Sequence, residues 1–521
     1  MSWDLARLWH ALAEQQPDRP ALIHDGHTLT WRQFDTAATG FAARLRQAGV
    51  RRGDVVALCL PNVLEYLVLV AGAMRCGATP CGVNYRYRLH ELATFLRHLQ
   101  PAVVCHSLGN EACLDRIRDQ LAEVRRWYAV DHRATAGGLA RLLLDTGGDR
   151  DQLDSRPEDV LLKCTGGTTG RPTAVRWFVG DVLTQLNDHN PWHQHDLAHG
   201  APKPAPVEPV RLLVVSPLMH GSGLTRAIGA LCAGGTVITQ RGFHPLQLLN
   251  ALALYHATSL AIVGDAHALP LVDMLDAEPN RWQLPDLATI TSSGAAWTAE
   301  VKRRLLQHLP QVRLLESLGA TEATGLGFSV ATASNVPPTG EFVLGRHARV
   351  FAANQPARPG HTGTIGVSWP HPAGLHPSGG LPADRFINHA GHRYLLSGDH
   401  VRLLDDERYL LLGRAGECIN TGGEKVYAPE VTDTLRRHPG VRDALVLGVP
   451  HPRLGQTVTA LVQLSPGTTT ENVREYARAQ LAGFKAPTVV IGVPAIPRTG
   501  AGKPDLITAH TLAAQHTGGT A

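Results

Sequence analysis

Residues 159–177 read DVLLKCTGGTTGRPTAVRW. The opening of this stretch is mostly apolar and ends in Lys163-Cys164, which predicts a buried strand. The run that follows contains only threonine and glycine: Thr165, Gly166, Gly167, Thr168, Thr169 and Gly170. Glycine lets backbone N–H groups converge on an anion, and threonine hydroxyls add further donors. The stretch therefore predicts a strand that opens into a phosphate-binding loop, although such a run by itself is equally compatible with an ordinary turn.

Around this loop the chain alternates strand-like and helix-like segments. Residues 29–49 predict a short strand and then an amphipathic helix that ends at Gly49, and residues 54–62 and 65–78 predict a buried strand and a helix. Further strand-like runs lie at 211–218, 234–239 and 259–264. This alternation predicts an α/β fold with parallel or mixed sheets covered by helices.

The texture of the sequence changes after Arg414. In residues 415–521 the stretch GECINTGGEKVYAPEV is followed by a predicted helix, the apolar runs DALVLGVP and TVTALVQL, another helix and a tail, which predicts a small α+β domain. Residues 1–414 then form a large N-terminal domain. Two stretches rich in turn-forming residues, 189–209 and 352–382, predict irregular surface loops.

Composition excludes several classes of protein. The chain has 521 residues, 44% of them hydrophobic and 18% charged, with a net charge of +4 and no basic block that would indicate nucleic-acid binding. No apolar run approaches the roughly 20 residues of a membrane span, and no signal peptide is recognisable. The eight cysteines form no CxxC pair. We expect a cytoplasmic protein without stable membrane insertion.

Four further motifs follow the Thr/Gly loop in order. They are SLGATEATG at 317–325, SGD at 397–399, GRAGECINTGGEKV at 413–426 and PRTGAGK at 497–503. In order and spacing they resemble the adenylate-forming (ANL) superfamily of AMP-dependent synthetases and ligases, and the resemblance extends from about residue 29 to Lys503. Other motifs resemble a bacterial, actinobacterial branch of acyl-CoA synthetases: CGVNYRY at 81–87, IVGDAHALP at 262–270, SSGAAW at 292–297 and INTGGEKVYAPEV at 419–431.

The resemblance implies an acetyl-CoA synthetase-like fold, with an adenylation domain over 1–414 and a mobile lid domain over 415–521. It implies that the enzyme uses ATP and Mg²⁺ to convert a small-molecule acid to its acyl-adenylate, with release of pyrophosphate. The acyl group then passes to an acceptor, for which CoA is the first expectation. Such enzymes are monomers or homodimers.

The resemblance also implies the nucleotide contacts. The Thr/Gly loop would hold the β- and γ-phosphates, Thr321 would bind the α-phosphate, and Glu322 would bind Mg²⁺. Asp399 and Arg414 would lie at the ribose. The adenine slot would be formed by Ser293, Gly294, Ala295, Ala296, Glu316, Ser317, Leu318, Gly319 and Ala320. Leu318 stands where many members have a tyrosine that stacks on the base.

Three residues are expected near the acid. Lys503 would place its cation between the carboxylate of the acid and the α-phosphate, where charge develops during transfer. It is one of only six lysines among 49 Lys and Arg residues. His220, directly after a predicted strand, would line the acid pocket, or else would be a packed histidine. Asp265 is a further candidate for the wall of this pocket.

The phosphate loop departs from the family pattern at Thr173, where members usually carry a lysine. Arg171 or Arg176 could supply the missing cation, although arginine differs from lysine in reach and geometry. The departure predicts weakened ATP binding or an unusual substrate. The four histidines of 189–199 would suggest zinc, but the sequence there offers no cysteine or carboxylate set to complete a site.

Two alternatives stay open at this point. The enzyme could adenylate a non-standard acid in natural-product biosynthesis and pass it to an amine, either as an amide-forming ligase or as an ATP-dependent diazotase that activates nitrite for an aryl amine. Alternatively, the chain could be a catalytically inert relic that still binds nucleotide. An exchange assay with different acids, with and without CoA, separates these readings.

Overall fold

A computed structural model describes most of the chain. The described residues are 3–87, 89–108, 111–130, 152–164, 173–188, 190, 192–197, 202–203, 206–377, 379–414, 418–421, 424–451, 455–481, 483–499 and 502–517. The predicted phosphate loop, Thr165 to Gly170, lies outside them, as does Arg171. The predicted domain boundary after residue 414 also falls beside residues that are not described, 415–417.

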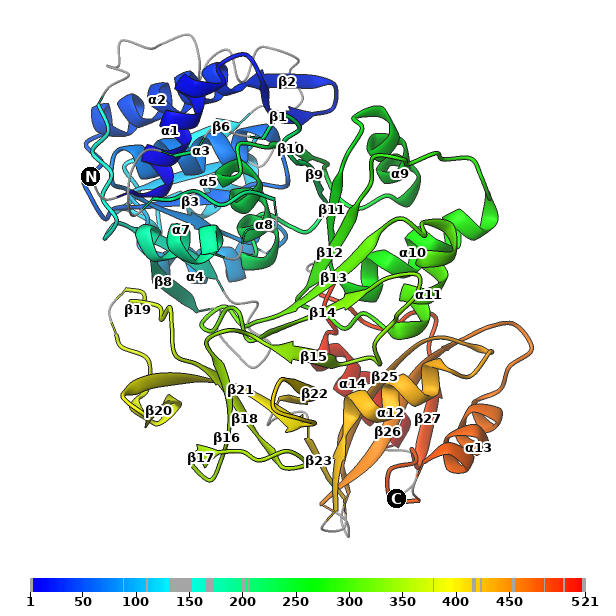
Figure 1. Ribbon diagram of the computed structural model, residues 1–521. Coiled ribbons are helices and arrows are strands. Elements are labelled where there is room, and N and C mark those ends of the chain that lie inside the picture. The colour runs from blue at the N-terminus through cyan, green and yellow to red at the C-terminus, as the bar shows by residue number, and fades with distance from the viewer. Residues whose placement is uncertain are drawn as a thin grey trace.

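The described residues of the large N-terminal part contain two sheets (Figure 1). One has the strand order β19-β8-β7-β4-β3-β5-β6. Its strands are β3 (Val55–Cys59), β4 (Thr79–Gly82), β5 (Val103–Ser107), β6 (Arg126–Val130), β7 (Val160–Cys164), β8 (Ala174–Phe178) and β19 (Gly374–Leu375). Its central strands are parallel, whereas β7 and β8 pair antiparallel on either side of the phosphate loop.

The second sheet is larger and has the order β17-β16-β18-β21-β22-β15-β14-β13-β12-β11-β9-β10-β1-β2, with β20 beside β21. One half, from β1 (Pro20–His24) to β13 (Arg313–Leu318), is parallel through β9 (Arg211–Val214), β10 (Thr236–Thr239), β11 (Ser259–Ile262) and β12 (Thr289–Ser293). The antiparallel strands are β2 (His27–Thr30), β14 (Gly327–Ala331), β15 (Glu341–Leu344), β16 (Ala348–Ala352), β17 (Gln355–Pro356), β18 (Thr362–Val367), β20 (Phe386–His389), β21 (His392–Leu403) and β22 (Arg408–Arg414).

Helices cover both sheets, as the alternation predicted. In the N-terminal part they are α1 (Leu5–Gln15), α2 (Trp31–Gln47), α3 (Leu64–Arg75), α4 (Leu89–Leu99), α5 (Glu111–Arg118), α7 (Val179–Asp188), α8 (Gly221–Cys232), α9 (Pro245–Leu254), α10 (Gly264–Ala277) and α11 (Ala299–His308). Thr30 begins α2 with a capping box completed by Gln33, and Gly49 follows the helix at φ +71°. The strand and helix predicted over 29–49 are confirmed.

The helix α3 explains how the layers pack. All twelve of its residues are buried, because it lies in the core between the sheets and contacts α2 and β4. Its sequence, LEYLVLVAGAMR, is accordingly apolar on all sides apart from Glu65 and Arg75 near its two ends. Gly72 allows the close contact with α2, since a Cβ there would lie 2.7 Å from the backbone oxygen of Ala38. None of the described helices is long and apolar enough to cross a membrane.

The C-terminal part has its own sheet, with β27 beside β26 in the order β24-β23-β26-β25. Its elements are β23 (Cys418–Thr421), β24 (Glu424–Tyr427), α12 (Ala428–Arg436), β25 (Val441–His451), β26 (Gly455–Leu464), α13 (Thr470–Gln480), β27 (Val489–Gly492) and α14 (Leu506–Thr517). Separate apolar clusters of this part hold α12 and α14 against the sheet. In Figure 1 it lies beside α11 and the β14–β15 hairpin of the large part.

One prediction about irregular structure is wrong. Residues 352–382 were expected to form a loop, but they contain β17, β18 and β19, and Ile365 of β18 is fully buried. The glycines and prolines of this stretch lie mostly between the short strands. Their number outweighs the few apolar residues of β18, so the sequence pattern favoured a loop. The described residues of 189–209 contain no helix or strand, in agreement with the prediction for that segment.

Candidate active site

The candidate site lies where the parallel strands β9, β11, β12 and β13 end. In open parallel sheets, ligands bind at the carboxyl ends of the strands. The C-terminal part reaches this edge with the loop that carries Lys503: a Cβ added to Gly502 would lie 3.1 Å from Cβ of Ala266 at the start of α10. Residues more than 200 positions apart in the sequence are thereby brought together.

Lys503 lies over Gly294, immediately after the end of β12. The Cε atom of Lys503 is 3.5 Å from the position of a Cβ on Gly294, which has φ +86°. Glycine is favoured at such a backbone conformation, and a Cβ there would make ordinary van der Waals contact with the aliphatic part of the lysine. The loop is held locally, since the backbone N–H of Thr499 donates to the carbonyl of Lys503 at 2.7 Å. The ammonium group is thus presented at the strand ends.

His220 precedes α8 and shares this region with Lys503. Burial, followed by the positive charges of Lys503 and Arg86, lowers the pKa of His220 to about 4. Its Nε2 atom is buried and has no hydrogen-bond partner among the described residues. A neutral imidazole that is kept uncharged by neighbouring cations fits a wall of an acid pocket better than a catalytic base.

The predicted adenine slot is formed by the loop after β12 and the end of β13. Ser293 and Ser317 are register partners on these strands. The carbonyl of Ala296 accepts from the backbone N–H of Asp265 at 2.9 Å, which fixes the loop against α10, while Gly294 remains exposed. Leu318 and Ala320 pack on the apolar cluster under β21 and β22.

Glu316 differs from its neighbours in the predicted slot. Its carboxylate accepts a hydrogen bond of 2.6 Å from Nζ of Lys302, and both side chains are buried. Lys302 also lies over the ring of Trp297. The carboxylate of Glu316 is thus engaged in a buried ion pair on the α11 side of the sheet, so only its backbone is left for a nucleotide.

The Thr321-Glu322 pair follows directly on this strand end. Nε1 of Trp177 donates to the carbonyl of Thr321 at 3.0 Å, so β8 holds the turn in place. The carboxylate of Glu322 is one-fifth exposed and lies 3.6 Å from Nη1 of Arg385. A partly open carboxylate of this kind fits Mg²⁺, which is usually held by one or two carboxylates together with phosphate oxygens of the substrate.

Asp399 and Arg414, the predicted ribose contacts, are register partners on β21 and β22. Asp399 is buried, and its backbone N–H donates to Oγ of Ser397 at 3.0 Å. The hydroxyl of Tyr409 lies near its charge: burial, followed by Asp399, raises the pKa of this tyrosine. The pairing of the strands thus brings Asp399 and Arg414 to one end of the hairpin.

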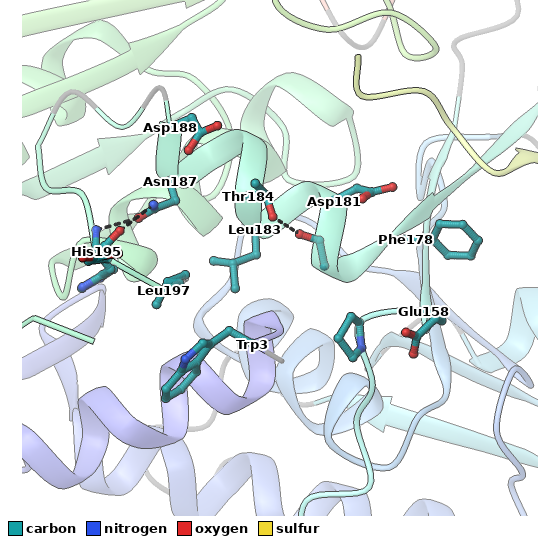
Figure 2. Close-up of a pocket in the computed structure, with 13 residues that line it drawn as sticks. Trp3, Glu158, Phe178, Asp181, Leu183, Thr184, Asn187, Asp188, His195 and Leu197 are labelled. Atoms are coloured by element: carbon teal, nitrogen blue, oxygen red, sulfur yellow. Dashed lines mark hydrogen bonds between the residues drawn. The ribbon is translucent and has the colours of Figure 1, made fainter. Parts of the chain in front are cut away.

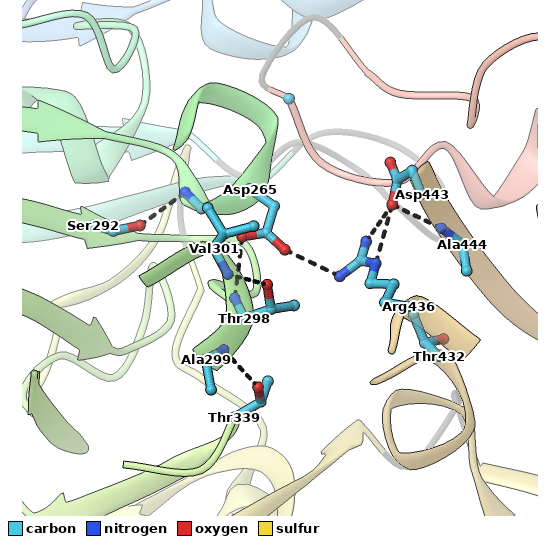
Figure 3. A network of polar contacts seen from close by, with 12 residues as sticks. Asp265, Ser292, Thr298, Ala299, Val301, Thr339, Thr432, Arg436, Asp443 and Ala444 are labelled. Atoms are coloured by element: carbon cyan, nitrogen blue, oxygen red, sulfur yellow. Dashed lines mark hydrogen bonds and ion pairs between the residues drawn. The ribbon is translucent and has the colours of Figure 1, made fainter. Parts of the chain in front are cut away.

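The two parts of the chain are joined by a chain of buried charges (Figure 3). Arg436 of α12 lies 3.3 Å from Asp265 of α10 and 2.6 Å from Asp443 of β25, which in turn accepts from Arg498 at 2.6 Å. Burial raises the pKa of Asp265, and Arg436 opposes that shift. Asp265 was expected to line the acid pocket. Its carboxylate instead holds the C-terminal part.

Two cations at the site were not recognised in the sequence. Lys163, at the end of β7, is only 4% exposed and lies 4.9 Å from the ring centroid of Trp177. Burial lowers its pKa to about 8, and no carboxylate of the described residues pairs with it. Arg226 of α8 donates to Oγ of Ser317 at 2.6 Å. Both could have been found from the sequence, because each is a charged residue within an otherwise apolar run, DVLLKC or GSGLTRAIGALC.

Arg176 is a candidate replacement for the missing loop lysine, and it lies beside His376. Burial lowers the pKa of His376, and the charge of Arg176 contributes a smaller part of that shift. Cys164, at the start of the loop, has its Sγ 3.4 Å from Sγ of Cys81, and both are free thiols. Thr173, the position that lacks the lysine, directly precedes β8. Lys163 is therefore the described cation that lies closest in sequence before the loop.

A cavity of about 550 Å³ lies away from this site (Figure 2). It lies between α1 and α7 and is lined by residues such as Trp3, Glu158 and Phe178. Glu158 and Phe178 mark the end of the β7–β8 hairpin opposite to the phosphate loop. His195 also lines it, with its Nε2 bonded to the carbonyl of Cys232.

No set of three metal-ligating side chains is found in the described parts of the chain.

Comparison with known proteins places the chain in a family. Residues 9–373 match the AMP-binding enzyme family, and residues 430–503 match the AMP-binding enzyme C-terminal domain. A medium/long-chain-fatty-acid–CoA/3-oxocholest-4-en-26-oate–CoA ligase of Mycolicibacterium smegmatis is 30% identical over 526 residues, which cover 97% of this chain and 95% of that protein. A feruloyl-CoA synthase of Amycolatopsis is 28% identical, with 96% of each chain covered.

Solved structures show the same fold. ATP-bound MatB from Rhodopseudomonas palustris superposes with a TM-score of 0.81 at 23% identity, covering 98% of this chain and 99% of that one. The anthranilate CoA ligase AuaEII in complex with anthranoyl-AMP gives a TM-score of 0.82 at 19% identity, with 99% and 98% covered. The predicted fold class is confirmed, and the chain belongs to the AMP-binding enzyme family.

Proposed function

We propose that the enzyme forms an acyl-adenylate at the carboxyl ends of β12 and β13, with Lys503 as the catalytic cation. The observation that carries this proposal is the position of Lys503 over Gly294. The Cε atom of Lys503 lies 3.5 Å from where a Cβ on Gly294 would be. The buried contact between Arg436 and Asp265 holds the C-terminal part in the arrangement that brings the lysine there. We further propose that residues 1–414 and 415–521 are the two units that move relative to each other.

The chain is an AMP-forming acid–CoA ligase. Relatives that align along nearly its whole length are named as CoA ligases of medium/long-chain fatty acids and 3-oxocholest-4-en-26-oate, and one is named as a feruloyl-CoA synthase. These names describe the substrates of the relatives and do not identify the acid of this chain. The acid of this chain is considered below, on the basis of its own pocket.

In the first half-reaction, a carboxylate oxygen of the acid attacks the α-phosphorus of ATP, and pyrophosphate leaves with the electrons of the broken P–O bond. Lys503 would stabilise the negative charge that builds up on the α-phosphate oxygens. Thr321 would donate to the same phosphate, and Asp399 would accept from the ribose hydroxyls. Glu322 would hold Mg²⁺, an ion that would supply further positive charge at the phosphates. The Thr/Gly loop at 165–170 would hold the leaving phosphates.

In the second half-reaction, the sulfur of CoA attacks the acyl carbonyl carbon, the bond from that carbon to the phosphate oxygen breaks, AMP leaves with its electrons, and the thiol proton passes to water. A cavity of about 280 Å³ lies between the large part and the Lys503 loop and offers a route for this thiol. Arg86 and Arg498 line it and make it positively charged, which favours phosphates, although Arg498 also donates to Asp443. Thr499 and Gly502 of the Lys503 loop form one wall, so withdrawal of this loop after adenylation would open the route.

An acid-dependent exchange of pyrophosphate into ATP tests the first half-reaction. We expect exchange with a suitable acid, and a loss of it when Lys503 is replaced. Product analysis with CoA, and separately with an amine plus nitrite, tests the acceptor; an amide or diazo product in place of a thioester would overturn the assignment of CoA. We place the reaction in the cytoplasm, where ATP and CoA are available.

A further inference from the structure

The helix α8 carries an arginine on the floor of the candidate site. Arg226 lies six residues after His220, and its Nη2 donates to Oγ of Ser317 at 2.6 Å. Ser317 is the register partner of Ser293, and the next residue, Gly294, supports Lys503. Arg226 and Lys503 therefore approach the ends of the same two strands, one from α8 and the other from the C-terminal loop.

The guanidinium of Arg226 has no carboxylate partner among the described residues. Burial alone lowers its pKa, and no nearby acid opposes the shift. The undescribed phosphate loop, 165–170, contains no Asp or Glu either. A guanidinium has five N–H donors, and the hydroxyl of Ser317 is the acceptor that the described residues supply.

A cation of this kind lowers the stability of the folded protein unless a ligand neutralises its charge. An unpaired charge that is taken out of water costs several kcal/mol, so buried charges are normally paired. Arg226 is neither fully buried nor exposed, so its side chain is not sealed within the core. An alkyl or steroid tail beside it would leave the guanidinium unpaired and would bind poorly.

We propose that Arg226 binds a second carboxylate of the substrate, so that the acid activated by this enzyme is a dicarboxylic acid. One carboxylate would be adenylated beside Lys503, and the other would pair with Arg226, which suits the planar shape of the guanidinium. Ser317 would orient the arginine. This inference rests on the proposed adenylation and specifies the class of acid, in contrast to the fatty and steroid acids named for the relatives.

Pyrophosphate exchange with matched acids tests the inference. A series of α,ω-dicarboxylic acids of increasing length is compared with the monocarboxylic acids of the same lengths, in wild type, Arg226→Met and Arg226→Lys. In wild type, the best dicarboxylic acid should exceed its monocarboxylic counterpart in kcat/KM by on the order of 100-fold. Arg226→Met should abolish that preference, and Arg226→Lys should restore part of it. Arg303→Met, which changes an exposed arginine paired with Glu300, should behave like wild type.

Thermal shifts give a readout that does not depend on turnover. The preferred dicarboxylate should raise the Tm of wild type but not that of Arg226→Met. Equal use of monocarboxylic acids by wild type, or a preference that survives in Arg226→Met, overturns the role of Arg226 while adenylation stands. Absence of exchange with every acid overturns the proposed function and this inference with it.

Discussion

The guanidinium of Arg436 lies 3.3 Å from the carboxylate of Asp265, and this contact joins the C-terminal part to the helix α10 of the large part. Arg436 is also paired with Asp443, which keeps the pKa of that carboxyl below its usual value despite burial. Because these charges are buried, breaking one link leaves the partners without compensation. The contact is therefore expected to favour the arrangement in which Lys503 occupies the site.

Replacing Arg436 by methionine should impair adenylation selectively. We expect a loss of roughly 30-fold in the rate of pyrophosphate exchange, since removing one partner of a buried charge pair typically costs 2 kcal/mol or more. Thioester formation from a synthetic acyl-adenylate should be unchanged, because that step does not use this arrangement. Arg437→Met is the matched control, as Arg437 is exposed and pairs only with Asp433 of its own helix among the described residues. Equal losses in both half-reactions would contradict this role.

Lys163→Met should stabilise the protein at neutral pH. The pKa of Lys163 is lowered to about 8 by burial, whereas an unfolded lysine titrates near 10.5. Replacing an unpaired buried charge by an apolar side chain is expected to add about 1 to 3 kcal/mol to the free energy of unfolding at pH 7. The unfolded state binds more protons between pH 8 and 10.5, so the stability contributed by this residue rises with pH over that range.

Urea unfolding at pH 7 and pH 9 measures this effect. The advantage of Lys163→Met over wild type should shrink by up to about 1.4 kcal/mol at pH 9, as the folded lysine loses its proton. Lys485→Met, at a partly exposed lysine paired with Glu430, should show no such dependence. A pH-independent difference for Lys163→Met would mean that the lysine is not a buried cation without a partner.

The neutral state of His220 predicts a specific acid sensitivity. Its folded pKa of about 4 lies below the unfolded value near 6.5, so the unfolded state takes up a proton first as the pH falls, and stability is lost below pH 6.5. His220→Phe should remove up to about 1.5 kcal/mol of the loss between pH 6.5 and pH 5. His256→Gln, at an exposed histidine beside Asp286, is the control. An unchanged pH dependence in His220→Phe would show that His220 is not held neutral.

The phosphate loop offers a test by gain of function. Thr173→Lys introduces the cation whose absence is predicted to weaken ATP binding. The added ammonium should lower KM for ATP roughly 10-fold, because a hydrogen bond to a charged group contributes about 1.5 kcal/mol or more. Thr173→Gln, of similar length without charge, should leave KM near the wild-type value. Equal KM values for Thr173→Lys and wild type would show that another cation already fills this place.

The sequence was sufficient for the α/β fold and for the order of the motifs. Periodicity and capping residues predicted the strand and helix of 29–49, because the local preferences there agree with the packing. The pairing of distant residues could not be read in the same way. Nothing in the sequence links Arg436 to Asp265, which are 171 positions apart and meet only through the docking of two parts.

Residue type also misled at individual positions. Glu316 stands in the predicted slot, but strand alternation turns its carboxylate toward Lys302 of α11. Lys163 and Arg226 are charged residues within apolar segments. The sequence shows that such a charge is present, but not which group it contacts in the folded protein. The roles of Thr165 to Gly170, and of Thr321, Glu322, Asp399 and Arg414 toward ATP and Mg²⁺, stay predictions.

Acid-dependent pyrophosphate exchange in wild type, Lys503→Ala and Lys485→Ala tests the central claim most directly. Wild type and Lys485→Ala should exchange pyrophosphate into ATP with a dicarboxylic acid and Mg²⁺, whereas Lys503→Ala should lose at least about 100-fold of the rate, as expected for removal of a charge from the transition state. A thermal shift with ATP confirms that the variants still bind nucleotide. Exchange by Lys503→Ala at the wild-type rate would contradict the assignment of Lys503 as the catalytic cation.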